Sequence, residues 1–195
     1  MTSGDDRGAE HWLDAHREGA RPEEALAFFD SLPAVTTSDM RGRWRGSGLR
    51  TGSPLDGLLE SYGWYGKEFR DDESVHPLLF TGRSGAPRPI DPGLLPMAVL
   101  RDWAGFLQFW PFRVGFAAIR PLLHTGKPRA RLREIRHRGV VTAAMVYDGL
   151  PIIDVFRSVS DDVRLGAMDM RGLPAPFLFR LDRDAPGRDR TLRSR

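Results

Sequence analysis

The sequence predicts a mainly β fold, in which antiparallel strands close into a small barrel that carries N-terminal helices and an inserted helical cap. Glycine and tryptophan alternate from residue 42 to residue 48 with the two-residue period of a β-strand. Glycine weakens a strand unless another group must come close, so one large ring among glycines is typical of a strand that closes a barrel floor. Residues 131–182 read as an antiparallel meander that supplies the closing strands. The shared face of the first strand carries Gly42, Trp44, Gly46 and Gly48.

The length of 195 residues fits one domain with accessory helices. We expect N-terminal helices in residues 1–30, a single barrel domain in 31–182 and a disordered, charged tail in 183–195. The chain has no cysteine, which excludes a disulfide scaffold, a thiol nucleophile and the usual zinc sites. Its polar beginning shows no secretory signal, and its longest uncharged apolar stretch is too short to span a bilayer. We therefore expect a cytoplasmic protein without a transmembrane segment.

The basic residues do not predict a nucleic-acid partner. The net charge is only +3, and the 29 basic residues are 27 arginines and two lysines, Lys67 and Lys127. The densest basic run, from Arg129 to Arg138, is interleaved with apolar residues like a strand that has one solvated face. The excess of arginine over lysine is more typical of a coding bias than of a phosphate-binding surface.

The first half of the barrel domain, 31–92, follows two short helices. Residues 7–20 carry apolar side chains at helical spacing, and a second helix is expected to begin at Pro22. Ser53 and Pro54 predict another helix start, with Leu55, Leu58, Leu59 and Tyr62 on its inner face and Gly63 at its end. Strands are expected at 64–69 and 75–80.

The region 93–128 is expected to form the helical cap. It is rich in aromatic rings and is broken at Pro111, which predicts one or two helices. Two interpretations stay open: core-facing helices, or an amphipathic cover that engages a lipid-like ligand or makes transient contact with a membrane. The rings are Trp103, Phe106, Phe109, Trp110, Phe112 and Phe116.

The second half, 129–182, contains a predicted hairpin around Asp148 and Gly149, a pair that favours a type I′ turn. Such a turn places Tyr147 opposite Leu150 and Met145 opposite Ile152. A three-residue closure at 160–162 then brings the strand 163–170 onto the same face, and 177–182 is the closing strand. The face combines Met145, Tyr147, Asp154, Phe156, Met168 and Met170, which suits either the wall of an apolar site or ordinary core packing.

Two polar residues in apolar strands are candidate functional groups. His76 is either a satisfied core histidine or a polar anchor or general base inside a cavity. Asp154 needs a partner or a raised pKa if it is buried; an arginine such as Arg136 would make it structural, and otherwise it orients a ligand. The five histidines show no metal-ligand spacing, so we predict neither a metal site nor a cofactor.

The motif Gly42-x-Trp44-x-Gly46, followed by residues 63–67 and 75–78, resembles the bacterial GXWXG domain family. Residues 143–148 and 150–154 are similar to the domain of unknown function that accompanies it, and together the resemblance covers roughly 25–182. It implies intracellular proteins without an assigned reaction and a lipocalin-like or fatty-acid-binding-protein-like shape.

The first strand is also similar to that of lipocalins and of nitrobindin haem proteins. This resemblance implies a late-strand arginine packed on the tryptophan, for which Arg180 is the candidate partner of Trp44. Nitrobindins present a histidine from the later part of the barrel, whereas this chain has no histidine after His137. The resemblance therefore does not lead us to expect haem.

These observations predict a carrier or sensor of a hydrophobic small molecule, such as a fatty-acid-, terpenoid- or polyketide-like ligand. An alternative is an isomerase, cyclase or hydratase that uses His76 and Asp154 as acid and base in the same cavity. A third is a structural or protein-interaction module that docks through the helical cap. The sequence does not predict an oligomeric state. The candidate ligand-binding residues are Trp44, His76, Met145, Tyr147, Asp154, Phe156, Met168 and Arg180.

Overall fold

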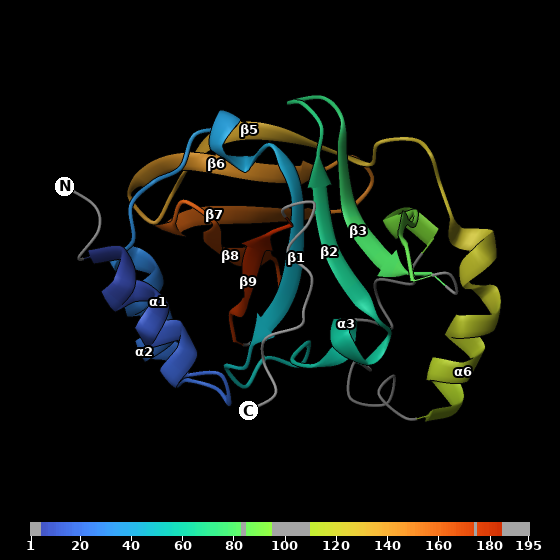
Figure 1. Cartoon of the computed structure of the whole chain (residues 1–195), viewed down its shortest axis with the longest axis horizontal. Coiled ribbons are helices and arrows are strands. Elements are labelled where there is room, and N and C mark those ends of the chain that lie inside the picture. The colour runs from blue at the N-terminus through green and yellow to red at the C-terminus, as the bar shows by residue number, and fades with distance from the viewer. Residues whose placement is uncertain (1–4, 83–84, 95–109, 174, 185–195) are drawn as a thin grey trace.

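Nine antiparallel strands form one sheet that closes on itself, as a computed structural model of residues 5–82, 85–94, 110–173 and 175–184 describes it (Figure 1). The strand order is β2-β1-β9-β8-β7-β6-β5-β3-β4, and an additional β2–β3 pairing completes the closure. The predicted mainly β, barrel-like fold is therefore confirmed. The strands are β1 Gly42–Leu49, β2 Trp64–Phe69, β3 Val75–Thr81, β4 Pro87–Pro89, β5 Ala130–His137, β6 Val140–Tyr147, β7 Ile152–Ser160, β8 Val163–Met170 and β9 Phe177–Arg183.

Helices lie on opposite sides of this closed sheet. The two N-terminal helices are on the left in Figure 1, and the helix that precedes β5 is on the right. The predicted N-terminal helices are present, and the second begins at Pro22, because proline is well suited to a first helical turn. The helices are α1 Asp5–Ala15, α2 Pro22–Ser31, α3 Leu58–Ser61 and α6 Trp110–Ile119, with short 3-10 turns η1 Ser38–Met40, η2 Pro92–Leu94 and η3 Arg120–Leu123.

Two apolar cores result from the alternation of side chains along the strands. The interior core lies within the closed sheet and contains Trp44, Phe69, Phe156 and Phe179. The outer core lies where α1 and α2 cover the sheet, and its members include Leu13, Ala25, Phe29, Val155 and Leu178. Both faces of the later strands are therefore apolar, as expected for a sheet that is covered on both sides.

Glycine in β1 makes room for a ring from the next strand. The Trp64 ring lies across Gly46, where an added Cβ would come within 2.2 Å of it. The Trp64 indole also donates a hydrogen bond of 3.0 Å to the backbone oxygen of Gly66. The alternation of glycine and tryptophan thus serves close packing inside the sheet, as predicted.

The hairpin of β6 and β7 corrects the predicted register. Met145 pairs with Asp154 rather than with Ile152, because residues 148–151 form a four-residue connection instead of a two-residue turn. Pro151 has no N–H for the ladder, and the Ile152 N–H donates to the Leu150 oxygen at 2.8 Å. The shift is two residues, so every side chain keeps its predicted face. The predicted pairing of β7 with β8 is confirmed, with Asp154 opposite Met168.

Two other boundaries differ from expectation. The helix predicted from Ser53 begins only at Leu58, because Gly57 adopts a left-handed conformation with a φ of 72° and ends the preceding turns. Strand β9 continues through Arg183, a residue that we had expected in the tail.

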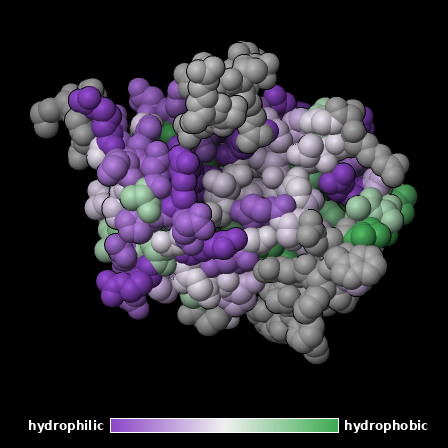
Figure 2. Space-filling model, turned by 60° about the horizontal axis from the view of Figure 1, so that its bottom comes forward, coloured by the Kyte–Doolittle hydropathy of each residue, from purple (hydrophilic) through white to green (hydrophobic). Residues whose placement is uncertain are grey.

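Of the region 93–128, in which we expect the cap, the structure describes residues 93–94 and 110–128, which include α6 and η3; Trp103, Phe106 and Phe109 lie outside the described residues. Val114, Ile119 and Leu122 expose 58%, 50% and 81% of their surface. Figure 2 shows apolar surface on the right of the molecule, the side on which α6 lies in Figure 1. Among the described residues, no helix is both long enough and apolar enough to cross a membrane.

Candidate functional site

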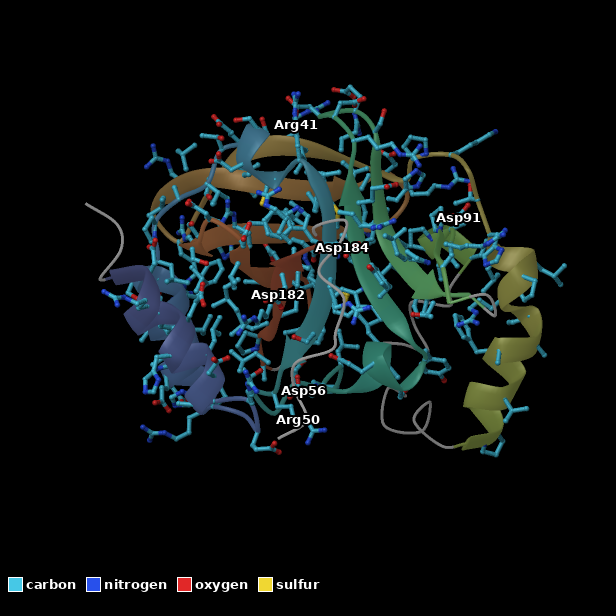
Figure 3. The ribbon with its side chains drawn as sticks, in the orientation of Figure 1. Arg41, Arg50, Asp56, Asp91, Asp182 and Asp184 are labelled. Carbon is cyan, nitrogen blue, oxygen red and sulfur yellow. The ribbon has the colours of Figure 1, made fainter. Side chains whose placement is uncertain are left out.

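One end of the interior is closed around Trp44, which is completely buried. Its indole donates a hydrogen bond of 2.7 Å to the Met40 oxygen. The guanidinium groups of Arg183 and Arg164 lie 4.2 and 5.2 Å from its ring centroid. Arg183 also donates to the backbone oxygen of Arg41, which immediately precedes β1 and is labelled in Figure 3. Cation–π contacts and carbonyl bonds therefore seal this end.

Arg180 is not the partner of Trp44, which corrects the expectation from the resemblance. Side chains alternate along β9, so Arg180 lies on the outer face, whereas Arg183 reaches the interior. Arg180 forms ion pairs with Asp182 at 2.7 Å and with Asp14 on α1 at 3.1 Å. It therefore fastens α1 to the sheet and takes no part in the interior.

A cavity occupies the other end of the interior. Its volume is about 660 Å³, a value that includes space open to solvent. Figure 3 shows Asp56 near the end of the molecule opposite Arg41. Asp56 accepts hydrogen bonds from the backbone N–H groups of residues 51, 52 and 53 and so holds the loop that carries Leu55. The cavity is lined by Leu55, Leu58, Leu59, Trp64, Lys67, Leu78, Pro92, Tyr147, Leu150, Ile152, Met168, Met170, Phe177 and Phe179.

Lys67 is the one charged residue among these described lining residues. Its side chain is only 2% exposed. The ammonium donates to Asp154 Oδ2 at 2.7 Å and to the Pro77 oxygen at 3.2 Å. Three aromatic rings surround the same nitrogen, with centroids 4.9 Å (Phe179), 5.7 Å (Trp64) and 5.8 Å (Tyr147) away. The cavity wall thus contains one ammonium group in an otherwise apolar and aromatic surface.

Asp154 is fully buried behind Lys67. Burial raises the pKa of its carboxyl, and the Lys67 ammonium opposes that effect. The Tyr147 hydroxyl lies 3.5 Å from Asp154 Oδ2, and burial followed by the nearby carboxylate raises the pKa of Tyr147 well above its ordinary value. Asp154 Oδ1 has no hydrogen-bond partner among the described residues. The partner that the sequence suggested, Arg136, is not the one that Asp154 uses.

The structure does not bring His76 into the cavity. His76 pairs across the sheet with Glu68, a residue on the face opposite that of Phe69 and the interior core. Its side chain is buried, and neither ring nitrogen has a hydrogen-bond partner among the described residues. Burial lowers the pKa of the imidazole, and Arg70 adds to this effect. His76 and Asp154 therefore do not form the acid–base pair that the sequence suggested.

The other predicted residues divide into two groups. Tyr147 and Met168 line the cavity, as the ligand-binding interpretation expects. Met145 and Phe156 belong to the interior core and do not line it. Phe156 packs edge-on against Phe69 at 5.6 Å and against Phe179 at 6.3 Å between ring centroids, which makes it part of the aromatic packing around the interior.

Lys67 was missed by sequence reasoning, although a signal was present. Arginine occupies 27 of the 29 basic positions of the chain, so the lysine between Gly66 and Glu68 is an unusual choice of basic residue. An ammonium is a compact point charge, whereas a guanidinium is planar and larger. The rarity of lysine therefore draws attention to Lys67, and burial separates it from Lys127, which is exposed.

Comparison with known proteins assigns the family. The model of the GXWXG protein family matches residues 27–85, and that of the domain of unknown function DUF4334 matches 128–183. A crystal structure of a protein from Thermomonospora curvata is 32% identical, covers 91% of this chain and 99% of its own, and superposes with a TM-score of 0.67. The chain belongs to the GXWXG family. No curated protein matches this GXWXG protein.

The family motif now has a structural meaning in this chain. Its tryptophan, Trp44, lies at the sealed end of the interior, and its last glycine, Gly46, receives the ring of Trp64. The cavity of this GXWXG protein is built by both matched regions, since Lys67 comes from the first and Tyr147 and Met168 from the second.

Proposed function

We propose that this GXWXG protein binds a hydrophobic small molecule in the cavity and acts as its carrier or sensor. The observation that carries the proposal is the composition of the cavity wall, in which a single ammonium, that of Lys67, interrupts an apolar and aromatic surface. Small-molecule sites combine such a surface with a few placed polar groups, because burial supplies affinity and the polar group fixes orientation.

Flexible side chains at the wall support the same proposal. Met168 and Met170 lie on β8 and are half-buried at the cavity, where unbranched thioethers can adapt to guests of different shape. Leu59 from α3 and Leu150 from the connection between β6 and β7 add further half-buried apolar groups at the cavity. A cytoplasmic location is our expectation for such a carrier.

The proposal is tested by the fluorescence of N-phenylnaphthylamine, a neutral probe that brightens in apolar sites. We expect the wild type to bind the probe and Leu59→Trp to bind it at least about tenfold more weakly, since the larger ring occupies the cavity. Leu122→Trp is the matched control, because it adds the same ring at a position that is 81% exposed. Equal binding by both variants would place the probe elsewhere and overturn the proposal.

Native mass spectrometry of protein purified from its own host supplies a second test. A retained guest that is lost in Leu59→Trp and kept in Leu122→Trp would name the ligand class. A wild-type protein that retains no apolar guest and binds no neutral probe would contradict carriage.

An enzymatic function is a second candidate, and the Lys67–Asp154 pair is the observation that favours it. A carboxyl with a raised pKa beside an ammonium is a suitable acid–base pair for an isomerase, cyclase or hydratase. The pair replaces the one that we first expected from His76 and Asp154. If the retained guest is converted by the wild type and not by Asp154→Asn, the protein is an enzyme; an unchanged guest in both favours carriage.

A further inference from the structure

We propose that the cavity selects neutral hydrophobic molecules that present an oxygen acceptor, such as a ketone, to Lys67, and that it rejects fatty-acid carboxylates. The inference rests on the proposed ligand-binding function and narrows its ligand class. It follows from the hydrogen bonds and the charge of the Lys67–Asp154 pair.

The hydrogen bonds of Lys67 define what the ligand must offer. An ammonium has three N–H donors and no acceptor. Asp154 Oδ2 and the Pro77 oxygen take two of them, at 2.7 and 3.2 Å. The third has only the faces of Phe179, Trp64 and Tyr147 nearby among the described residues, and Lys67 itself lines the cavity. A ligand oxygen would give this donor the acceptor that the protein does not provide.

The charge of the pair decides which oxygen is accepted. Lys67 and Asp154 carry no net charge together, whether the shared proton lies on the nitrogen or on the carboxyl. A carboxylate ligand would therefore bring an uncompensated negative charge into a site where Asp154 is completely buried. A ketone oxygen accepts the same hydrogen bond and keeps the site neutral.

No other described group of the cavity wall offsets a ligand carboxylate. Apart from Lys67, the lining consists of aliphatic, proline, methionine and aromatic residues, and its single hydroxyl belongs to Tyr147. That hydroxyl lies 3.5 Å from Asp154 Oδ2. It is therefore directed at the Asp154 carboxyl, whose own negative charge disfavours a ligand carboxylate nearby. Neutral ligands are favoured by the whole wall as well as by the pair.

The experiment compares decanone, decanoate and decane as competitors of N-phenylnaphthylamine at neutral pH. In the wild type, we expect decanone to displace the probe at a concentration at least about tenfold below that of decanoate and of decane. The double variant Lys67→Met, Asp154→Leu replaces both members of the pair with apolar side chains of similar shape. It should still bind the probe and lose the preference for decanone over decane.

Lys127→Met is the matched control, because it removes the chain's other lysine at an exposed site, and it should keep the wild-type order. Stronger displacement by decanoate than by decanone, or a ketone preference that survives in the double variant, overturns the inference and leaves ligand binding intact. A wild type that fails to bind the probe overturns the proposed function and this inference with it. Circular dichroism of the double variant checks that it folds, and the double variant Lys67→Met, Asp154→Asn, which also removes both charges, repeats the test if it does not.

Discussion

The Lys67 ammonium on β2 donates a hydrogen bond of 2.7 Å to Asp154 on β7, and these strands are not neighbours in the sheet. The pair therefore crosses the interior and is not part of any strand ladder. Both side chains are withdrawn from water, with 2% and 0% exposure. Burying two charges is unfavourable, so the pair is better suited to fixing a specific arrangement at the cavity than to stabilising the fold.

Removal of one member of this pair should be more harmful than removal of both. We expect Lys67→Met to lower the free energy of unfolding by about 3–5 kcal/mol, because it leaves the Asp154 carboxylate buried and unpaired. The double variant Lys67→Met, Asp154→Leu should recover most of that loss. Urea unfolding measures both values, and a double variant that is less stable than Lys67→Met would contradict the explanation.

The size of the cation at position 67 gives a second prediction. Lys67→Arg places a planar guanidinium among three rings, and we expect a loss of about 1–3 kcal/mol in the free energy of unfolding from overpacking. Lys127→Arg makes the same exchange at an exposed turn, where the change should stay within about 0.5 kcal/mol. Thermal and urea unfolding of the two variants give the comparison, and equal stabilities would show that position 67 tolerates either cation.

The contact between Gly46 and Trp64 gives a third prediction. Gly46→Ala sets a methyl group 2.2 Å from the Trp64 ring, so the ring must move, and we expect a loss of about 1–3 kcal/mol. Because Trp64 lines the cavity, probe affinity should fall as well. Gly115→Ala in α6 has open space around the new methyl group and should instead stabilise the helix by up to about 1 kcal/mol. Similar effects of the two substitutions would refute the packing argument.

The sealed end gives a fourth prediction, in which two arginines of one strand are compared. Arg183→Gln removes the cation 4.2 Å from the Trp44 ring centroid and two bonds to backbone oxygens, so we expect a loss of about 1–3 kcal/mol. Arg180→Gln removes partly exposed ion pairs on the outer face, which contribute about 0–1 kcal/mol. Chemical denaturation ranks the two, and a larger effect at Arg180 would reverse the assignment.

His76 gives a fifth prediction, which concerns acid stability. Burial lowers its pKa in the folded protein below the ordinary value of 6.5, so the unfolded chain binds the proton more readily. The stability is fully present above pH 6.5 and is lost as the pH falls through the window between 6.5 and the lowered value, by up to about 1.4 kcal/mol per pH unit.

We expect His76→Leu to flatten this slope, because it removes the group that titrates. At neutral pH the variant should be as stable as the wild type or more stable, since the two ring nitrogens have no partner among the described residues. Urea unfolding between about pH 7 and about pH 5 measures the slope. His124 and His137 also have lowered pKa values and contribute to the slope that remains. A variant with the wild-type slope would exclude His76 as its source.

The sequence was sufficient to predict the faces of the late strands, because side-chain direction depends only on period two. The hairpin register was wrong by two residues, and that error left Met145, Tyr147 and Asp154 on the correct side. The residues that they pair with across the β6–β7 hairpin depend on Pro151. Because Pro151 has no N–H for the ladder, the connection between the two strands is longer than a two-residue turn.

The site was harder to predict, because β2 and β3 depart from a regular period. Register shifts between Trp64 and Gly66 and between Gly66 and Glu68 turn Lys67 into the interior, where simple alternation from Trp64 would place it outside. In β3, the first six residues are all buried. The run of buried residues therefore does not reveal that Phe80 belongs to the interior core and His76 does not. Because these strands are irregular, the sequence pattern did not predict that Lys67 lines the cavity, and it wrongly predicted that His76 does.

The closure of the sheet also determines where it opens most easily. Strands β3 and β5 share a single register pair, Val75 with Ala130, whereas every other neighbouring pair of described strands shares at least three. Two further backbone bonds, from Arg129 to Val75 and from Leu132 to Asp72, also hold this seam. Separation there breaks few bonds and leaves the remaining ladders intact. Local opening along this seam is therefore the least costly fluctuation of the sheet, and amide hydrogens at the seam should exchange with solvent before those of β7 and β8.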